Sequence, residues 1–180
     1  DEVFARLGSD GVVPVVTLHD AAAAPDVAKA LLAGGIRSIE LTMRTATAED
    51  SLKAIAESVP DILLGAGTVL SVAQGERALA CGAQFIVAPG TNAKVVQWAQ
   101  SVGVPIIPGV ATATEVEAAL ELGLTHLKFF PAEPMGGLKT LKALSAPYPM
   151  VRWMPTGGVN LANVAGYLGT SCIMAAGGSW

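Results

Sequence analysis

Short β-branched and apolar runs alternate along the whole chain with longer segments in which Ala, Leu and Val recur at helical spacing. Each run is followed by a turn and then by a helical segment, so the pattern predicts alternating strands and helices. The expected strands are Val12–Thr17, Ser38–Leu41, Ile62–Gly65, Phe85–Ala88, Ile106–Pro108, Leu127–Phe130, Val151–Met154 and Cys172–Ala175. The expected helices are Asp20–Ala33, Thr47–Glu57, Ser71–Cys81, Asn92–Val102, Ala113–Leu122, Leu138–Ser145 and Leu161–Leu168.

Eight strands separated by helices favour parallel strands joined by right-handed crossovers. Because the expected strands are almost continuously apolar, both faces of the sheet should be buried. We therefore predict an α/β fold of the closed (β/α)8 or TIM-barrel type, with residues 1–180 as a single domain. A doubly wound open sheet is the alternative, and the absence of a GxGxxG motif after the first strand argues against it.

Two features of the chain differ from a complete barrel. Its 180 residues are fewer than the roughly 200 or more of a usual barrel. The sequence ends at Trp180, soon after the eighth expected strand, so no residues follow to form the last outer helix. We expect a barrel that is incomplete at its C-terminal end and lacks this helix. Residues Glu2–Leu7 are expected to form a short helix across the barrel floor.

Composition and charge narrow the class of protein. Hydrophobic residues make up 52% of the chain and charged residues 14%, which excludes a disordered protein. The net charge is −4 and no run of Lys or Arg occurs, so no nucleic-acid partner is expected. No apolar stretch reaches the roughly 18 uncharged residues of a membrane span, so no membrane partner is expected either. Cys81 and Cys172 form neither a disulfide framework nor a metal-ligand spacing, which fits a cytoplasmic protein.

One lysine stands out among the polar residues at the C-terminal ends of the strands, where barrels carry their chemistry. Lys128 lies between Leu127 and Phe129 in an expected buried strand, whereas the other lysines lie on helical patterns. A buried ammonium group is costly unless it is paired or loses its proton, and a lysine poised to lose its proton is a nucleophile toward carbonyl carbons. The alternatives are a structural ion pair with Glu40 and a lysine that points outward under a helix.

A second isolated charge, Glu40, lies between Ile39 and Leu41. A carboxylate beside a buried lysine is suited to general base catalysis, and the alternative is a passive counter-ion for Lys128 or Arg44. Arg44 follows the same strand and can bind a substrate carboxylate through two hydrogen bonds, unless it is simply an exposed arginine.

Glycine-rich turns follow the seventh and eighth expected strands, where barrels usually bind phosphate. In such sites backbone N–H groups and the N-terminus of a following short helix hold the anion. Gly157-Gly158 and Gly177-Gly178-Ser179 occupy these two places, although glycine pairs also serve ordinary tight turns.

No metal site is expected. His19 and His126 are the only histidines, and no paired-histidine spacing occurs. His126 lies two residues before Lys128, so both side chains should face the same side of a strand, and a core or rim histidine is expected rather than a metal ligand. The GxSxG motif of serine hydrolases is also absent.

Many stretches of the sequence, in order, resemble the class I 2-keto-3-deoxy-6-phosphogluconate (KDPG) aldolases, which also act as 4-hydroxy-2-oxoglutarate (KHG) aldolases. The resemblance covers nearly the whole chain, so it is more specific than any one motif. The matching stretches are VVPVV (Val12–Val16), IELTMRT (Ile39–Thr45), GAGTV (Gly65–Val69), FIVAPG (Phe85–Gly90), IPG (Ile107–Gly109), KFFPAE (Lys128–Glu133), PTGGV (Pro155–Val159) and GGSW (Gly177–Trp180).

The resemblance implies a role for each matching residue. It places the Schiff-base lysine at Lys128 and the general acid–base glutamate at Glu40. It implies that Arg44 binds the pyruvyl carboxylate with help from Thr68, and that Thr156 contacts the hydroxyl-bearing part of the substrate. The other implied residues are Pro89 and Phe130 for the substrate, and Gly157, Gly158, Gly177, Gly178 and Ser179 for the phosphate.

We expect a pyruvate-dependent aldolase that cleaves KDPG to pyruvate and glyceraldehyde 3-phosphate without a metal or other cofactor. Its implied partners are the phosphorylated keto acid and pyruvate, and the resemblance implies a C3 homotrimer. The alternatives are an aldolase of unphosphorylated KHG or an oxaloacetate decarboxylase, a phosphosugar isomerase that uses Glu40 without an imine, and a non-catalytic barrel used as an oligomeric scaffold.

Overall fold

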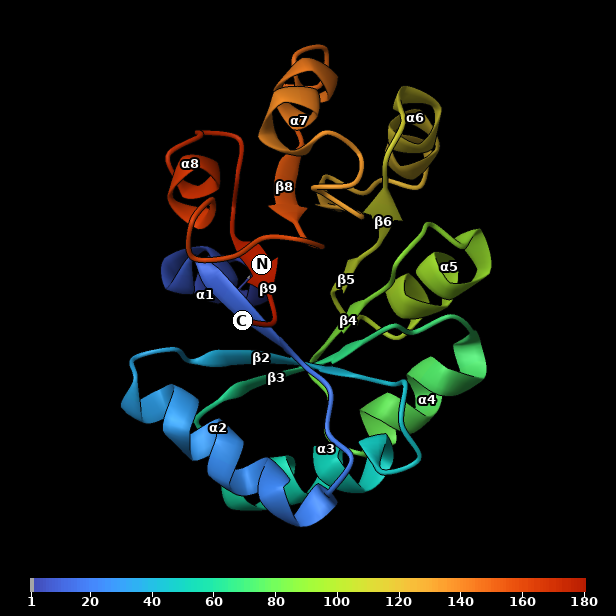
Figure 1. Cartoon of the computed structure of the whole chain (residues 1–180). Coiled ribbons are helices and arrows are strands. Elements are labelled where there is room, and N and C mark those ends of the chain that lie inside the picture. The colour runs from blue at the N-terminus through green and yellow to red at the C-terminus, as the bar shows by residue number, and fades with distance from the viewer. Residues whose placement is uncertain (1) are drawn as a thin grey trace.

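The computed structural model describes residues 2–180 as an α/β fold with parallel strands at the centre and helices around them (Figure 1). The strands are β1 Val12–Val16, β2 Ser38–Thr42, β3 Leu63–Gly67, β4 Phe85–Val87, β5 Ile106–Ile107, β6 Gly109–Val110, β7 His126–Phe129, β8 Arg152–Pro155 and β9 Ala176–Gly178. The helices are α1 Glu2–Asp10, the 3-10 turn η1 Ala21–Ala23, α2 Ala24–Ala33, α3 Ala48–Ser58, α4 Val72–Ala80, α5 Ala93–Ser101, α6 Ala113–Glu121, α7 Gly137–Ser145 and α8 Val164–Leu168.

All strand ladders are parallel, as the alternating pattern predicts. Six strands form a half-barrel in the order β5-β4-β3-β2-β1-β9, and three more form a sheet in the order β6-β7-β8. Pro108 separates β5 from β6, and a proline has no N–H group for a ladder. Single parallel bridges join Trp153 to Ile173 and Thr156 to Gly177, which brings β8 beside the segment that ends in β9. The α/β class and the parallel arrangement are therefore confirmed.

The last strand is the largest departure from the sequence prediction. Cys172–Ala175 was the expected strand, but β9 is Ala176–Gly178, which pairs with Val12–Pro14 of the first strand. The apolar residues Met174 and Ala175 instead pack into the interior before the strand begins. The prediction was wrong because it followed hydrophobicity, whereas two of the three residues of β9 are glycines.

Most helix ends differ from the prediction by one residue, because the capping residue was counted as helical. Ser71 and Asn92 are N-caps whose side chains accept hydrogen bonds from the backbone N–H groups of Gln74 and Lys94. The helix expected at Leu161–Leu168 is shorter, since α8 begins only at Val164.

The interior enclosed by the strands is a separate apolar core. It is formed by buried side chains from α1 and from strands of both sheets. Two larger apolar cores lie elsewhere in the fold. One of them combines residues of β2, β3 and β4 with residues of the helices α2 to α5. The buried members of the interior core are Leu7, Val13, Leu63, Phe85, Val87, Ile107, Met154 and Ala175. A polar side chain that faces inward from the strands therefore has an apolar environment beneath it.

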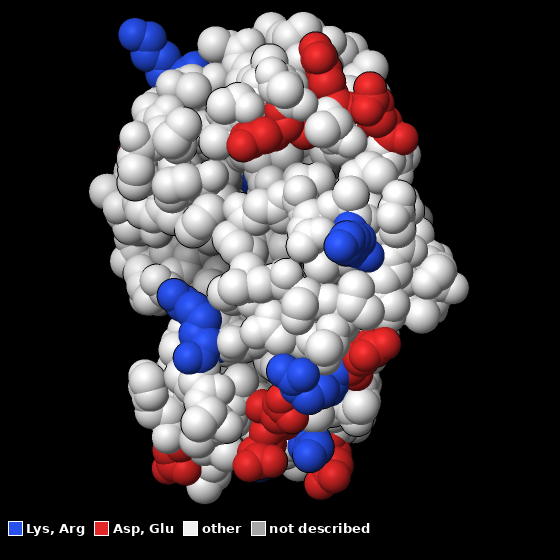
Figure 2. Space-filling model, turned by 90° about the vertical axis from the view of Figure 1, so that its right-hand side faces the viewer, with Lys and Arg blue, Asp and Glu red and all other residues white. Residues whose placement is uncertain are grey.

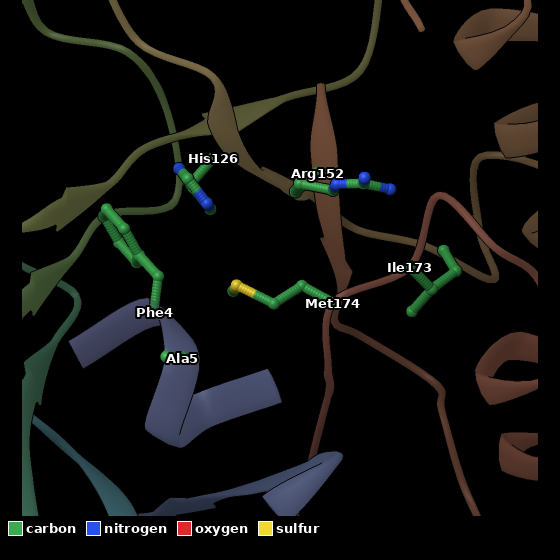
Figure 3. A pocket seen from close by; sticks show the side chains of 6 residues that line it. All are labelled: Phe4, Ala5, His126, Arg152, Ile173 and Met174. Atoms are coloured by element: carbon green, nitrogen blue, oxygen red, sulfur yellow. The ribbon is translucent and has the colours of Figure 1, made fainter. Parts of the chain in front are cut away.

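Helix α1 is the floor helix that the sequence predicted. It ends at Asp10, three residues later than the expected end at Leu7. Its Phe4 ring stacks on His126 at the start of β7, with ring centroids 3.8 Å apart and planes at 10° (Figure 3). The two rings border a cavity of about 340 Å³ whose other walls include Arg152, Ile173 and Met174. His126 is thus a half-buried histidine packed at the floor, whereas the sequence predicted a core or rim position.

The surface carries no dominant charge on the face shown in Figure 2, where small groups of basic and acidic side chains are scattered over a mainly uncharged surface. Within residues 2–180, no helix has the length and apolar character needed to span a bilayer.

Burial of His126 makes a prediction about pH. Burial is the main cause that lowers the pKa of His126, and the positive charge of Arg152 acts in the same direction, so the folded protein resists protonating it. The unfolded chain then binds a proton that the native state does not bind, and stability falls as the pH drops below the ordinary pKa of about 6.5. We expect His126→Gln to lose less unfolding free energy than the wild type when urea denaturation is compared at about pH 7.5 and about pH 5.5.

The matched control is His19→Gln, which removes the other histidine from an exposed position. It should show the pH dependence of the wild type. An identical loss of stability in His126→Gln and the wild type would contradict the assignment to His126.

Candidate functional site

A buried ion pair crosses the interior of the fold and joins its two sheets. Lys128 Nζ on β7 lies 3.5 Å from Glu40 Oε1 on β2, and the two side chains are 6% and 1% exposed. The alternative in which Lys128 points outward under a helix is therefore wrong. The pair itself is compatible both with catalysis and with a structural role, so the groups around it must distinguish the two.

The carboxylate of Glu40 occupies space that two neighbouring strands leave open. Gly67 on β3 faces it, and a Cβ atom on Gly67 would lie only 2.2 Å from Glu40 Oε1. Two residues earlier, the missing side chain of Gly65 makes room for the ring of Phe85. Sequence analysis missed the packing role of these glycines. Their spacing of two, which turns both toward the interior, was the available signal.

Within residues 2–180, four buried side-chain atoms have no hydrogen-bond partner, and two of them belong to expected site residues, namely Glu40 Oε2 and Thr156 Oγ1. The other two are Ser38 Oγ and Trp153 Nε1. Buried polar atoms are normally paired, because an unpaired one costs free energy. The Glu40 and Thr156 oxygen atoms are therefore available to a bound molecule. The ring of Phe130 covers the lysine from another side, with its centroid 5.1 Å from Lys128 Nζ. These unused acceptors favour a reactive site over a passive ion pair.

A cavity of about 150 Å³ opens on the rim of the strands and collects most of the expected site residues. Two of its lining residues, Val15 and Val159, were not predicted. The predicted residues that line it are Arg44, Phe130, Thr156, Gly157, Gly158, Gly178 and Ser179. Gly177 adjoins it, because a Cβ atom there would lie 2.3 Å from Thr156 Oγ1.

Arg44 is held by a threonine that sequence analysis did not single out. Arg44 Nη2 donates a hydrogen bond of 2.9 Å to Thr17 Oγ1, which in turn lies 2.8 Å from Thr42 Oγ1. The guanidinium group carries five N–H donors, so most of them stay free for an anionic ligand. The arrangement orients Arg44 without neutralising it.

Besides Gly177, four expected site residues do not line this cavity, namely Lys128, Glu40, Thr68 and Pro89. Thr68 follows Gly67 and has a φ of +59°, a left-handed conformation that a β-branched residue rarely adopts and that often marks functional sites. Pro89 lies close to Gly109, where a Cβ atom would be 2.0 Å from the Pro89 carbonyl oxygen, and Gly109 is the register partner of Lys128. Thr68 and Pro89 are thus near the ion pair in the fold, although within residues 2–180 neither forms a hydrogen bond with Lys128 or Glu40.

The glycine turn after β8 exposes backbone N–H groups. Gly157 and Gly158 have φ values of +100° and +82°, and the N–H groups of Gly158 and Val159 donate to no acceptor within the described part of the chain. The N–H groups at the start of α8 are occupied, since Ala162, Asn163 and Val164 all donate to Asn160. Any anion at this turn therefore meets the turn itself rather than the helix end.

The floor cavity of about 340 Å³ is larger than the cavity at the rim and lies apart from it. It lies at the floor, beside Phe4 and the first residues of β7 and β8, whereas the ion pair and the glycine turns lie toward the C-terminal ends of the strands. Residues 2–180 also contain no group of three or more His, Cys, Asp or Glu side chains placed to hold a metal ion.

Comparison with known proteins gives consistent matches over nearly the whole chain. The family model described as KDPG and KHG aldolase matches residues 3–180. The 2-dehydro-3-deoxy-phosphogluconate aldolase of Treponema pallidum (strain Nichols) is 50% identical over 178 residues, which are 99% of this chain and 85% of that protein.

Two similar crystal structures carry small molecules. The KDPG aldolase of Zymomonas mobilis ZM4 with 3-phosphoglycerate has a TM-score of 0.96 and 38% identity, over 99% of this chain and 85% of that one. The KDPG aldolase of Legionella pneumophila, with pyruvate captured at low pH as a covalent carbinolamine intermediate, has a TM-score of 0.96 and 38% identity, over 100% and 87%.

The fit between Gly67 and Glu40 makes a prediction about stability. Gly67→Ala should lower the unfolding free energy by about 1–3 kcal/mol, because its Cβ atom overlaps the carboxylate at 2.2 Å in a closely packed interior. The loss caused by Gly67→Ala should be smaller in a Glu40→Ala background, because that background lacks the overlapping atoms. Urea denaturation of the two single variants and the double variant measures the coupling.

Gly8→Ala is the matched control, because its Cβ atom would meet only ordinary contacts at 3.6 Å or more. A Gly67→Ala protein as stable as the wild type, or a double variant whose losses simply add, would contradict this account of the packing.

Proposed function

The chain belongs to the KDPG and KHG aldolase family, and we propose that it cleaves KDPG through a Schiff base on Lys128. Family membership makes it an aldolase, and so a lyase. The observation that carries the proposal is the buried pair of Lys128 and Glu40, 3.5 Å apart, which the ring of Phe130 connects to a rim cavity lined by Arg44 and a glycine turn. Similar proteins with covalent pyruvate and with 3-phosphoglycerate support the same substrate halves.

Lys128 is the nucleophile in the first step. The Lys128 ammonium group first gives a proton to Glu40, and the resulting amine attacks the C2 ketone of the substrate to give a carbinolamine. Glu40 returns the proton to the departing hydroxyl, and loss of water gives an iminium ion. Glu40 Oε1, 3.5 Å from Nζ, is placed to accept and return the protons of this step. The apolar interior beneath the pair keeps bulk water away from the amine.

Glu40 is the acid–base group in the second step. Acting through a water, it takes the proton of the C4 hydroxyl, and the C3–C4 bond breaks. The bonding electrons move into the iminium, which becomes an enamine, and glyceraldehyde 3-phosphate leaves. Glu40 then returns a proton to C3, and hydrolysis of the resulting iminium releases pyruvate and regenerates the Lys128 amine. The iminium itself withdraws the electrons, so the step needs no metal ion.

Different residues at the rim contact different parts of the substrate. Arg44 pairs with the pyruvyl carboxylate, and Thr68, Pro89 and Phe130 border this end. Thr156, whose hydroxyl oxygen is buried without a partner in residues 2–180, meets the hydroxyl-bearing carbons. The phosphate lies against the residues of the two glycine turns, which are Gly157, Gly158, Gly177, Gly178 and Ser179.

The open N–H groups of the glycine turn favour a phosphorylated substrate over unphosphorylated KHG or oxaloacetate, which share the chemistry but lack the phosphate. We also propose that the two sheets are parts of one (β/α)8 barrel, and that the protein works as a cytoplasmic C3 homotrimer. The single domain over residues 1–180, of which residue 1 lies outside the described part, and the missing last helix stay predictions.

Trapping with borohydride tests the nucleophile. Incubation with pyruvate and sodium borohydride, followed by peptide mapping, should show one reduced pyruvyl adduct on Lys128. Lys128→Ala should lose both the adduct and turnover, because no other lysine lies beside the carboxylate of Glu40. Lys142→Ala, which removes an exposed lysine of α7, is the control and should keep both. Near-wild-type turnover in Lys128→Ala would falsify the mechanism.

Glu40→Gln separates imine formation from bond cleavage. The amide keeps the shape of the side chain but cannot take a proton, so KDPG cleavage should fall about 10²- to 10⁴-fold while the pyruvate adduct on Lys128 still forms. Steady-state assays and trapping on the same preparation measure the two effects. Glu57→Gln, at an exposed position of α3, should change neither. Unchanged cleavage in Glu40→Gln would assign the proton transfers to another group.

A further inference from the structure

The glycine turn after β8 is held from behind by two asparagine side chains. Asn160 Nδ2 and Asn163 Nδ2 each donate a hydrogen bond of 3.1 Å to the carbonyl oxygen of Gly158. The two asparagines are also tied to each other, because the Asn160 N–H donates to Asn163 Oδ1 at 2.8 Å. Neither asparagine lines the rim cavity, whereas Gly158 and Val159 do.

This contact fixes the direction of one peptide group. In a trans peptide the C=O and the following N–H point in opposite directions. The two amides draw the Gly158 carbonyl away from the cavity, so the Val159 N–H points the opposite way, toward it. Two successive glycines with positive φ could otherwise rotate this peptide and present its oxygen to the cavity.

A second anchor on the same helix holds the adjacent loop. Tyr167, four residues after Asn163 and so on the same side of α8, donates a hydrogen bond of 2.5 Å to Glu133 Oε1. The backbone N–H of Glu133 in turn donates to the carbonyl oxygen of Gly157 at 2.9 Å. Burial and then the Glu133 carboxylate raise the pKa of Tyr167, so the phenol keeps the proton that it donates.

We propose that Asn160 and Asn163 are positioning residues that set the preference of the site for phosphorylated substrates. They act through the Gly158 peptide, whose orientation decides whether an N–H donor or a carbonyl oxygen meets the phosphate. An unphosphorylated keto acid does not reach this contact, so its cleavage is independent of the two amides. The inference rests on the proposed aldolase function and adds the residues that select its substrate.

The test compares two substrates in one neutral double variant, Asn160→Ala/Asn163→Ala. Its kcat/KM for KDPG should fall about tenfold or more, the effect of weakening one hydrogen bond to a charged group, while kcat/KM for KHG stays within about twofold. Pyruvate trapping on Lys128 should be unchanged. Tyr167→Phe, which releases only the second anchor, should shift the ratio of the two substrates in the same direction.

Two variants calibrate the comparison. Asn92→Ala removes an N-cap asparagine of α5 that makes no contact with the glycine turns, and it should leave the substrate ratio unchanged. Ser179→Asp places a negative charge in the proposed phosphate site, and it should lower KDPG cleavage selectively. Equal losses for KDPG and KHG in the double variant would indicate a general structural role and overturn the proposal, as would no loss for either.

Binding of inorganic phosphate tests the inference without the reaction. Phosphate should raise the thermal midpoint of the wild type and of Asn92→Ala, and raise that of the double variant much less. If the wild type cleaves neither substrate and forms no adduct, the proposed function fails, while this phosphate measurement still decides whether the amides orient an anion site. Equal stabilisation of the wild type and the double variant would refute the inference.

Discussion

The burial of two opposite charges in an apolar interior is the constraint on which the rest of the structure depends. Lys128 and Glu40 are almost completely enclosed and lie on strands of different sheets, and within residues 2–180 neither has another ion-pair partner. Removing such charges from water costs several kcal/mol per ion, and their attraction offsets this cost only at close range. The strands must therefore bring the two side chains together without admitting solvent, and the side chain that Gly67 lacks is what makes the space.

The same interior separates two ends with different tasks. His126 and Lys128 are two residues apart on β7, so both side chains face inward, yet one packs on the floor helix and the other lies beside the rim cavity. At the floor, Phe4 stacks on His126 beside the larger cavity, and the described residues form no ion pair across the interior there. At the rim, unused oxygen atoms and open N–H groups surround a small cavity. The floor cavity is the larger of the two, so cavity size does not locate the site, whereas the cavity lined by most of the expected site residues lies at the rim.

Sequence reasoning succeeded where a single physical preference decides the outcome. An isolated charge within an apolar strand has few possible explanations, which is why Lys128 and Glu40 were found together. It failed for β9, because a glycine-rich strand that pairs through its backbone has no hydrophobic signal. It also passed over Asn160 and Asn163, since asparagines after a glycine pair are typical of any turn. Their importance lies in which carbonyl they hold, and that is a property of three-dimensional geometry alone.

The proposed phosphate site is built from peptide groups rather than from cations. Among the residues that line the rim cavity, Arg44 is the only charged one, and we assign it to the carboxylate end of the substrate. A cationic side chain can follow an anion by changing rotamer, but a peptide N–H is useful only in one orientation. A phosphate site built from peptide N–H groups is selective only if these groups are held rigidly. Glycine permits the turn but does not make it rigid. The rigidity has to come from outside the turn, and the amides behind Gly158 are placed to provide it.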